Sequence, residues 1–157
     1  MKKILFIITT CILCSCSNNI IYSHFQSFPI NGWDKDTAIN FNFSIEDTIQ
    51  PCDILLYVRH TQAYPYQNMW LFIDKQMINN SDTILLGKDT IEFYLADERG
   101  RWLGNGYGNI KEMPVLYEQK TLFHNSGQYY ITISQGMREN VLKGVSDIGL
   151  KIEKSQN

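Results

Sequence analysis

Hydrophobic and polar residues alternate along most of the chain beyond residue 20, with the period of β-strands that bury one face. The pattern is clearest at 38–45, where Ile39, Phe41, Phe43 and Ile45 fall on the same face. Shorter runs that suit strands lie at 54–60, 69–73, 83–86, 90–95, 129–133 and 148–152. No segment has a strong helical period, although 134–143 is compatible with one short helical turn.

Turn-forming residues separate these runs at fairly regular intervals. They occur at Asn31-Gly32, Pro51, 79–81, 104–109 and Pro114. The triplet Gly87-Lys88-Asp89 predicts a short hairpin connection between 83–86 and 90–95. About eight to ten short strands at this spacing predict an all-β fold, an antiparallel β-sandwich of jelly-roll or Ig-like type.

Length and composition agree with one such domain at residues 20–157. The chain has 157 residues, of which 13% are aromatic, and no linker, repeat or low-complexity segment interrupts it. The net charge is −2, and it becomes −4 once residues 1–15 are removed. Because no basic patch is available to neutralise phosphates, nucleic acid is excluded as a partner.

The N-terminal segment has the organisation of a bacterial signal peptide. Lys2 and Lys3 precede ten uncharged, mostly apolar residues at 4–13. This run fits the apolar region of a signal peptide and is much shorter than the roughly 20 residues that a membrane-spanning helix needs. Residues 1–15 are therefore predicted to be a signal peptide.

The sequence Leu13-Cys14-Ser15-Cys16 resembles the lipobox of bacterial lipoproteins. Cys16 has the aliphatic Leu13 three positions before it, whereas Cys14 has Cys11 at that position. We therefore predict lipidation of Cys16, followed by a short tether at 16–19. A plain secretory peptide that is cleaved nearby remains the alternative.

Two features of the sequence bear on where the protein resides. Position 17 is Ser rather than the Asp that retains lipoproteins in the inner membrane of enterobacteria, and no acidic cluster follows Cys16. We expect a lipid anchor in the outer membrane, on its periplasmic face. After processing and lipidation only Cys52 remains, which leaves no intramolecular disulfide and predicts a small apolar side chain that is buried or half-buried rather than a reactive thiol.

The search for catalytic chemistry yields no site. His24, His60 and His124 stand alone, without the spacing of a metal site. The glycines of 104–108 precede no helix start, so we interpret them as a loop or a bulged strand rather than a phosphate site. We predict a non-enzymatic protein with no catalytic, cofactor-binding or metal-binding residue.

The densest polar segment comprises Asp97, Glu98, Arg99, Arg101 and Trp102. A charged hairpin tip is the simplest interpretation. A partner-binding loop is the second, because Arg and Trp are frequent at the energetic centres of interfaces. General acid–base chemistry by the two carboxylates is the weakest, since no second carboxylate pair can be placed from the sequence.

Aromatic side chains suggest a second kind of binding surface. Tyr64, Tyr66 and Trp70 lie close together in the sequence. Such rings stack on sugars, but they are equally ordinary in the core or rim of a sandwich. The alternative function is therefore a carbohydrate-binding module that uses Tyr64, Tyr66 and Trp102.

Four Asp-Thr pairs are each followed by an aliphatic residue. The threonines are Thr37, Thr48, Thr83 and Thr90. The pattern matches the O-glycosylation motif of Bacteroides-type bacteria, and we predict a glycan on at least one of them. The plainer interpretation is that Asp suits turns and Thr suits the start of strands.

Longer stretches resemble the gliding-motility lipoprotein GldH family of Bacteroidetes. They are 65–73 (Pro-Tyr-Gln-Asn-Met-Trp-Leu-Phe-Ile), 89–104 (Asp-Thr-Ile-Glu-Phe-Tyr-Leu-Ala-Asp-Glu-Arg-Gly-Arg-Trp-Leu-Gly), Met137-Arg138 and 144–152 (Gly-Val-Ser-Asp-Ile-Gly-Leu-Lys-Ile). The resemblance covers essentially the whole chain, including the signal and the lipobox. The central 97–104 stretch is the most specific part.

This resemblance implies an outer-envelope lipoprotein required for gliding motility, acting beside other envelope lipoproteins and the type IX secretion machinery. It implies no catalytic residue, because none is established for the family. Family members also occur in bacteria that do not glide, so a role in envelope assembly is compatible with the same resemblance.

Overall fold

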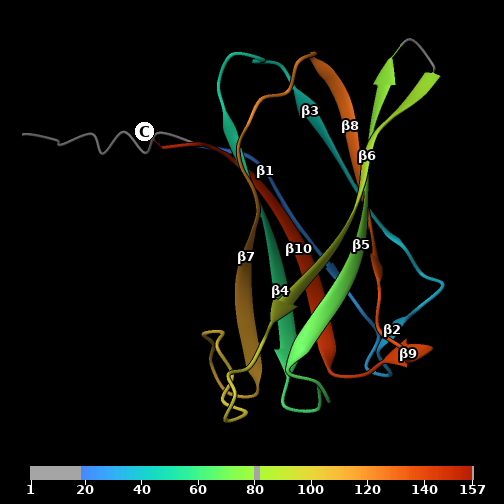
Figure 1. Cartoon of the computed structure of the whole chain (residues 1–157), viewed down its shortest axis with the longest axis vertical. Coiled ribbons are helices and arrows are strands. Elements are labelled where there is room, and N and C mark those ends of the chain that lie inside the picture. Colours follow the sequence, from blue (N-terminus) through green and yellow to red (C-terminus); the bar gives the residue numbers. More distant parts are fainter. Residues whose placement is uncertain (1–18, 80–81, 157) are drawn as a thin grey trace, which may run out of the picture.

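Two four-stranded antiparallel sheets face each other in the computed structural model, which describes residues 19–79 and 82–156 (Figure 1). The first sheet contains, in spatial order, β1 (Ile20–Ser27), β10 (Val145–Lys154), β4 (Cys52–Thr61) and β7 (Ile110–Thr121). The second contains β3 (Ile39–Ile45), β8 (Gly127–Gln135), β5 (Asn68–Asn79) and β6 (Asp82–Tyr94). The short strands β2 (Trp33–Asp34) and β9 (Val141–Leu142) pair separately. The predicted all-β sandwich is confirmed.

The connectivity is that of a jelly roll rather than an Ig-like domain. Strands pair as β1 with β10, β3 with β8, β4 with β7 and β5 with β6, so the chain forms one long hairpin with the β5–β6 turn at its tip. This hairpin folds over repeatedly, because the chain crosses between the sheets after each long strand except at β5–β6. The result is the double-sheet arrangement typical of jelly rolls.

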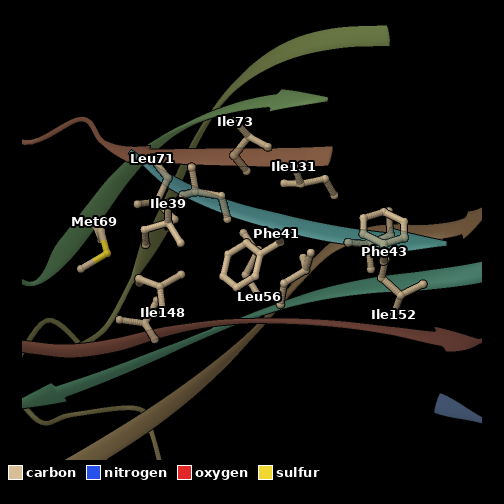
Figure 2. Packing of buried hydrophobic residues seen from close by; sticks show 14 of the residues in the cluster. Ile39, Phe41, Phe43, Leu56, Met69, Leu71, Ile73, Ile131, Ile148 and Ile152 are labelled. Atoms are coloured by element: carbon tan, nitrogen blue, oxygen red, sulfur yellow. The ribbon is translucent and has the colours of Figure 1, made fainter. Parts of the chain in front are cut away.

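The core lies between the sheets and follows directly from the alternation in the sequence. In β3 and β4, every second side chain is buried and the intervening ones are exposed or half-buried. Phe41 from one sheet and Leu56 from the other are completely buried at the centre (Figure 2). At roughly 1.5–3 kcal/mol per buried large apolar side chain, this layer is the main source of stability.

The expected hairpin at Gly87-Lys88-Asp89 is wrong, because β6 runs through it without a break. The chain reverses earlier, where Asn79 pairs with Asp82. Gly87 pairs with Lys75, and the register shifts between Lys75 and Gln76, which accommodates one extra residue of β6 as a bulge. Turn-forming residues are tolerated here because Asp89 finds polar partners between the sheets, as described below.

Pro114 does not mark a turn, contrary to the prediction, but lies inside β7 opposite Tyr57. Because β7 is the edge of its sheet, a residue without an N–H group costs no hydrogen bond on the outer side. The helical turn allowed at 134–143 is also wrong. That segment contains the end of β8, a bend and β9.

The sandwich has two different ends, visible at the top and bottom of Figure 1. The proximal end carries the start of β1, the end of β10 and the segments 46–51 and 122–126, and there Lys154 N–H donates to the carbonyl of Asn19 (2.8 Å). The distal end carries 62–67, 95–109, 136–140 and the β2–β9 pair. The predicted signal peptide and Cys16 lie outside the described residues, but the chain enters the sandwich at the proximal end.

Candidate functional site

The polar segment singled out in the sequence forms a tight, ordered loop at the distal end. Ala96 and Trp102 pair across it, and Leu103 N–H donates to the carbonyl of Leu95 (2.8 Å). Gly100 turns the chain with φ of 75°, a left-handed conformation that glycine adopts without strain. The loop is therefore held in one shape by its own backbone.

Asp97 is the internal support of this loop. Its carboxylate accepts hydrogen bonds from the backbone N–H groups of Arg101 (2.8 Å) and Arg99 (2.9 Å) and from Nε of Arg101 (2.7 Å). These bonds, first among them that from the Arg101 N–H, lower the pKa of Asp97. A carboxylate so occupied is a poor proton donor, and the side chains left free at the tip are those of Glu98 and Arg99, both exposed.

Trp102 points back toward the core rather than into solvent. Its ring lies 4.4 Å from that of His60 between centroids, and 6.4 Å from that of Tyr64. His60 is completely buried, and burial lowers its pKa, so the imidazole is neutral at pH 7. Trp102 thus joins the loop to the apolar interior and closes the distal end of the core.

The glycines at 104–106 let the rest of the loop lie flat on the start of β7. A Cβ on Gly104 would stand 2.6 Å from the carbonyl oxygen of Glu112, and one on Gly106 would stand 2.1 Å from that of Ile110. The loop interpretation of this stretch is confirmed. Tyr107 is fully exposed and Leu103 about half exposed in the same loop.

A groove of about 410 Å³ opens on the second sheet near this loop. Trp70 lines it together with Tyr66, Asn68 and residues 136–139, and Tyr66 donates a hydrogen bond to Glu139. The other carboxylate oxygen of Glu139 is buried and has no hydrogen-bond partner among residues 19–79 and 82–156. No pattern in the sequence points to Glu139, which stands 73 residues from Tyr66 in the chain.

The predicted sugar-stacking trio does not form an open platform. Tyr64 is buried, with its hydroxyl donating to the Asn68 carbonyl (2.7 Å), and Tyr66 and Trp102 are half-buried. Edge-to-face packing joins Tyr64 and Tyr66 at 5.9 Å between ring centroids. Tyr64 is therefore a core residue, and Trp70 is more exposed than any of the three rings of the trio.

The four Asp-Thr pairs have different surroundings. Thr37, Thr83 and Thr90 are exposed and Thr48 is half-buried. Asp47 accepts a hydrogen bond from the N–H of Ile49 (2.9 Å), which is the turn role expected for Asp.

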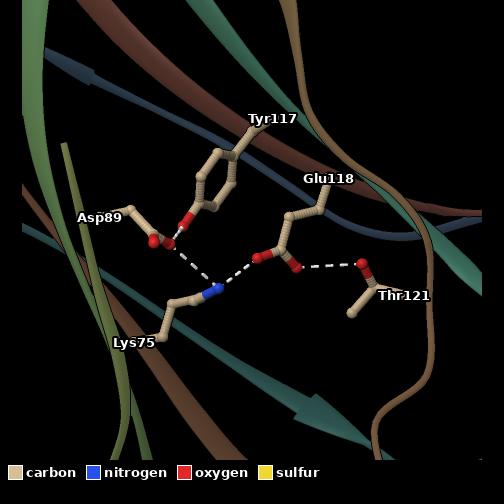
Figure 3. A network of polar contacts seen from close by, with 5 residues as sticks. All are labelled: Lys75, Asp89, Tyr117, Glu118 and Thr121. Carbon is tan, nitrogen blue, oxygen red and sulfur yellow. Dashed lines mark hydrogen bonds and ion pairs between the residues drawn. The ribbon is translucent and has the colours of Figure 1, made fainter. Parts of the chain in front are cut away.

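A second polar cluster lies between the open edges of the two sheets and is shown in Figure 3. The Nζ of Lys75 on β5 pairs with Glu118 on β7 and with Asp89 on β6, the latter at 3.1 Å. Tyr117 donates to Asp89, and Thr121 donates to Glu118 at 3.0 Å. Burial opposes the charge on Lys75, but the two carboxylates outweigh it and raise its pKa, while the Tyr117 bond and Lys75 lower that of Asp89.

Other chemical groups are sparse in 19–79 and 82–156. Within these ranges, no three His, Cys, Asp or Glu side chains gather as metal ligands, and no helix is suited to crossing a membrane. Cys52 is buried and forms no disulfide in this part of the chain, its thiol donates a hydrogen bond to the carbonyl of Gln50 (3.4 Å), and burial raises the pKa of the thiol.

Comparison with known proteins decides the family. The model of the GldH lipoprotein family matches residues 20–152, from the start of β1 to within β10. The chain belongs to the GldH lipoprotein family. It is 31% identical to a gliding motility lipoprotein GldH homolog of Christiangramia forsetii, over 98% of this chain and 95% of that protein. It is 25% identical to the gliding motility lipoprotein GldH of Flavobacterium johnsoniae, over 95% of this chain and 94% of that protein.

Membership confirms the resemblance found in the sequence and makes the protein a gliding-motility lipoprotein by family. Among solved structures, a cellulose-specific carbohydrate-binding module is similar, with a TM-score of 0.40 and 12% identity over 86% of this chain and 75% of that one. The dimeric latent PorU of Porphyromonas gingivalis is similar with a TM-score of 0.34 and 8% identity, over 87% of this chain and 13% of that one.

Proposed function

We propose that the protein is a non-enzymatic lipoprotein of the outer membrane, anchored through Cys16 and facing the periplasm. The lipobox register and the family name both support the anchor. One acyl chain holds a protein only marginally, whereas the two or three chains of bacterial lipoproteins hold it durably. In this position the protein is a component or assembly factor of the machinery for gliding motility and associated type IX secretion.

The distal loop is the docking site that best suits this role. The observation that carries it is the position of a rigid, charged tip with Glu98 and Arg99 exposed, at the end of the sandwich opposite the chain's entry. Tyr107 and Leu103 add exposed apolar area elsewhere in the same loop. A preformed loop binds with little ordering cost, so it suits contact with other envelope lipoproteins.

The anchor is tested by Cys16→Ala in the native bacterium. The variant is expected to fold normally, with an unchanged urea midpoint, and to appear in the soluble envelope fraction. Continued fractionation of the variant with membranes would refute the anchor.

The docking site is tested by Glu98→Lys combined with Arg99→Glu, which exchanges the charges without changing the net charge. Crosslinking in cells followed by affinity capture should show loss of specific partners. The matched control is Lys88→Glu with Glu92→Lys, two exposed residues of β6, which should leave those partners in place. An unchanged partner set in the distal variant would refute the loop's role.

A carbohydrate-binding role is the second candidate, and the groove beside Trp70 favours it. The groove combines an exposed indole with the polar groups of Asn68, Arg138 and Glu139, which is the usual composition of a sugar site. Oligosaccharides released from the bacterium's own envelope should change the tryptophan emission of the wild type but not of Trp70→Phe. No change in either protein would remove this candidate.

O-glycosylation at Thr37, Thr48, Thr83 or Thr90 remains a proposal. The exposure of three of these hydroxyls makes them accessible to a transferase. The intact mass of protein from its native host tests it, because a mass equal to polypeptide plus lipid would contradict any glycan.

A further inference from the structure

The proximal end exposes aliphatic side chains from three separate segments of the chain. Ile49 between β3 and β4 is almost fully exposed, and Leu122 after β7 is about half exposed. Ile84 and Leu85 add two more at the start of β6. Single exposed apolar residues are ordinary, and the distal end has them too, at Ile30 and Leu103. What distinguishes those of the proximal end is that they lie at the end where the chain enters the sandwich.

The chain enters the sandwich at this same end, and this limits how far the proximal end can lie from the anchored Cys16. Only three residue steps separate Cys16 from Asn19, and a fully extended chain spans at most about 3.6 Å per residue. The lipidated cysteine of the proposed anchor therefore lies within roughly 11 Å of Asn19. Asn19 is bonded to the end of β10, so the proximal end is the end of the sandwich that faces the membrane surface.

We propose that the proximal end rests on the lipid bilayer itself, with Ile49, Leu85 and Leu122 in the boundary between headgroups and acyl chains. The proposal rests on the Cys16 anchor proposed above. The short tether brings these side chains to the lipid and leaves little room for a protein between them. Apolar side chains that enter this boundary gain free energy by leaving water, as interfacial helices do.

Charges at this end set the depth of the contact. Lys120 and Lys154 are exposed here and suit anionic headgroups. Asp47 and Asp53 also lie here, and backbone hydrogen bonds from Ile49 and Lys120 lower the pKa of these two carboxyl groups respectively. Because both stay ionised at neutral pH, the sandwich touches the bilayer by its aliphatic side chains and does not sink into it.

The experiment places a polarity-sensitive fluorophore on single cysteines of the lipidated, full-length protein in vesicles of phosphatidylethanolamine and phosphatidylglycerol. Buried Cys52 does not react, and lipid blocks Cys16. The test positions are Leu85→Cys and Leu122→Cys, whose parent side chains are 52% and 46% exposed. Their matched controls are Leu116→Cys in the middle of β7 and Leu103→Cys at the distal end, whose parents are 52% and 49% exposed.

Lipids with a nitroxide on the acyl chain should quench the two proximal probes at least threefold more than the two controls. Equal quenching at all four positions, in protein that floats with the vesicles, would overturn the proposal while leaving the anchor intact. Failure of the protein to float would instead refute the anchor. Probes that become shielded only in native membranes, and not in pure lipid, would identify a protein partner as the occupant and would also overturn the proposal.

Discussion

The Lys75 cluster offers the sharpest test of the forces that close the open edge of the sandwich. Lys75 points between the sheets, where its side chain is 23% exposed, and it neutralises Asp89 and Glu118 together. Lys75→Met keeps the length and the apolar stem of the side chain but removes the charge. The variant leaves two carboxylates facing each other without a cation between them.

The expected loss follows from the exposure of the pairs. A hydrogen bond to a charged group is worth about 1.5–3 kcal/mol when buried, and an exposed ion pair is worth about 0–1 kcal/mol. These two pairs are intermediate, at about 1 kcal/mol each, so Lys75→Met should lower the free energy of unfolding by about 2 kcal/mol. With a slope near 2 kcal/mol per M, the urea midpoint should fall by about 1 M.

The assay is urea denaturation at pH 7, with unfolding monitored by tryptophan fluorescence. The matched control is Lys88→Met, on the neighbouring strand, because Lys88 pairs with Asp74 but is 63% exposed. Lys88→Met should lower the free energy of unfolding by less than about 0.5 kcal/mol. Asp89→Asn in the Lys75→Met background should recover part of the stability, since it removes one of the two opposed charges.

A loss in Lys75→Met no larger than that in Lys88→Met would refute this reasoning. It would mean that water screens the cluster as fully as it screens the surface pair. A loss that Asp89→Asn does not reduce would show that the cost comes from packing around the new side chain rather than from repulsion.

Three further predictions concern the backbone and the distal core. Lys120 has φ of 52°, so Lys120→Gly should raise the free energy of unfolding by about 0.5–1 kcal/mol in urea titrations, while Lys120→Ala should not. Gly144→Ala should lower it by more than about 2 kcal/mol by the same measurement, because φ is 80° and the new Cβ would lie 2.2 Å from the Tyr64 nitrogen. Buried His60 resists protonation when folded, so the stability that it contributes is present above pH 6.5 and falls as the pH drops below that value. Urea midpoints from pH 8 to pH 5.5 should show this decline, and His60→Phe should reduce it.

Much of the sandwich is predictable because many of its strands, whether central or at an edge, bury one face completely. The alternation in β3 and β4 gives their buried residues directly. Strand β7 escaped prediction because it is an edge strand that is partly exposed on both faces and contains Pro114. The false hairpin at Gly87-Lys88-Asp89 had a similar cause, since the partners that hold Asp89 inward are distant in the chain.

The distal loop shows the same limit for a candidate site. The sequence located the charged segment but not the role of each side chain in it. Asp97 holds the loop through hydrogen bonds to its backbone, whereas the side chains of Glu98 and Arg99 remain free. These roles depend on the backbone conformation of the loop, which the sequence pattern does not reveal. Likewise, the Tyr66–Glu139 and Lys75–Glu118 contacts join residues 73 and 43 positions apart, and only the folded jelly roll brings them together.

The entry of the chain at the proximal end also decides how the domain would bear mechanical load. If the anchor holds β1 at Ile20 while a partner pulls on the distal end, the two forces act along the strands in opposite directions. The hydrogen bonds between β1 and β10 lie across that direction, from Ile20 to Ser27. They are therefore loaded in shear and must fail together, whereas a strand peeled from its free end breaks one bond at a time. Strand β1, which follows the proposed anchor, is thus paired with β10 in the geometry that best resists a pulling force.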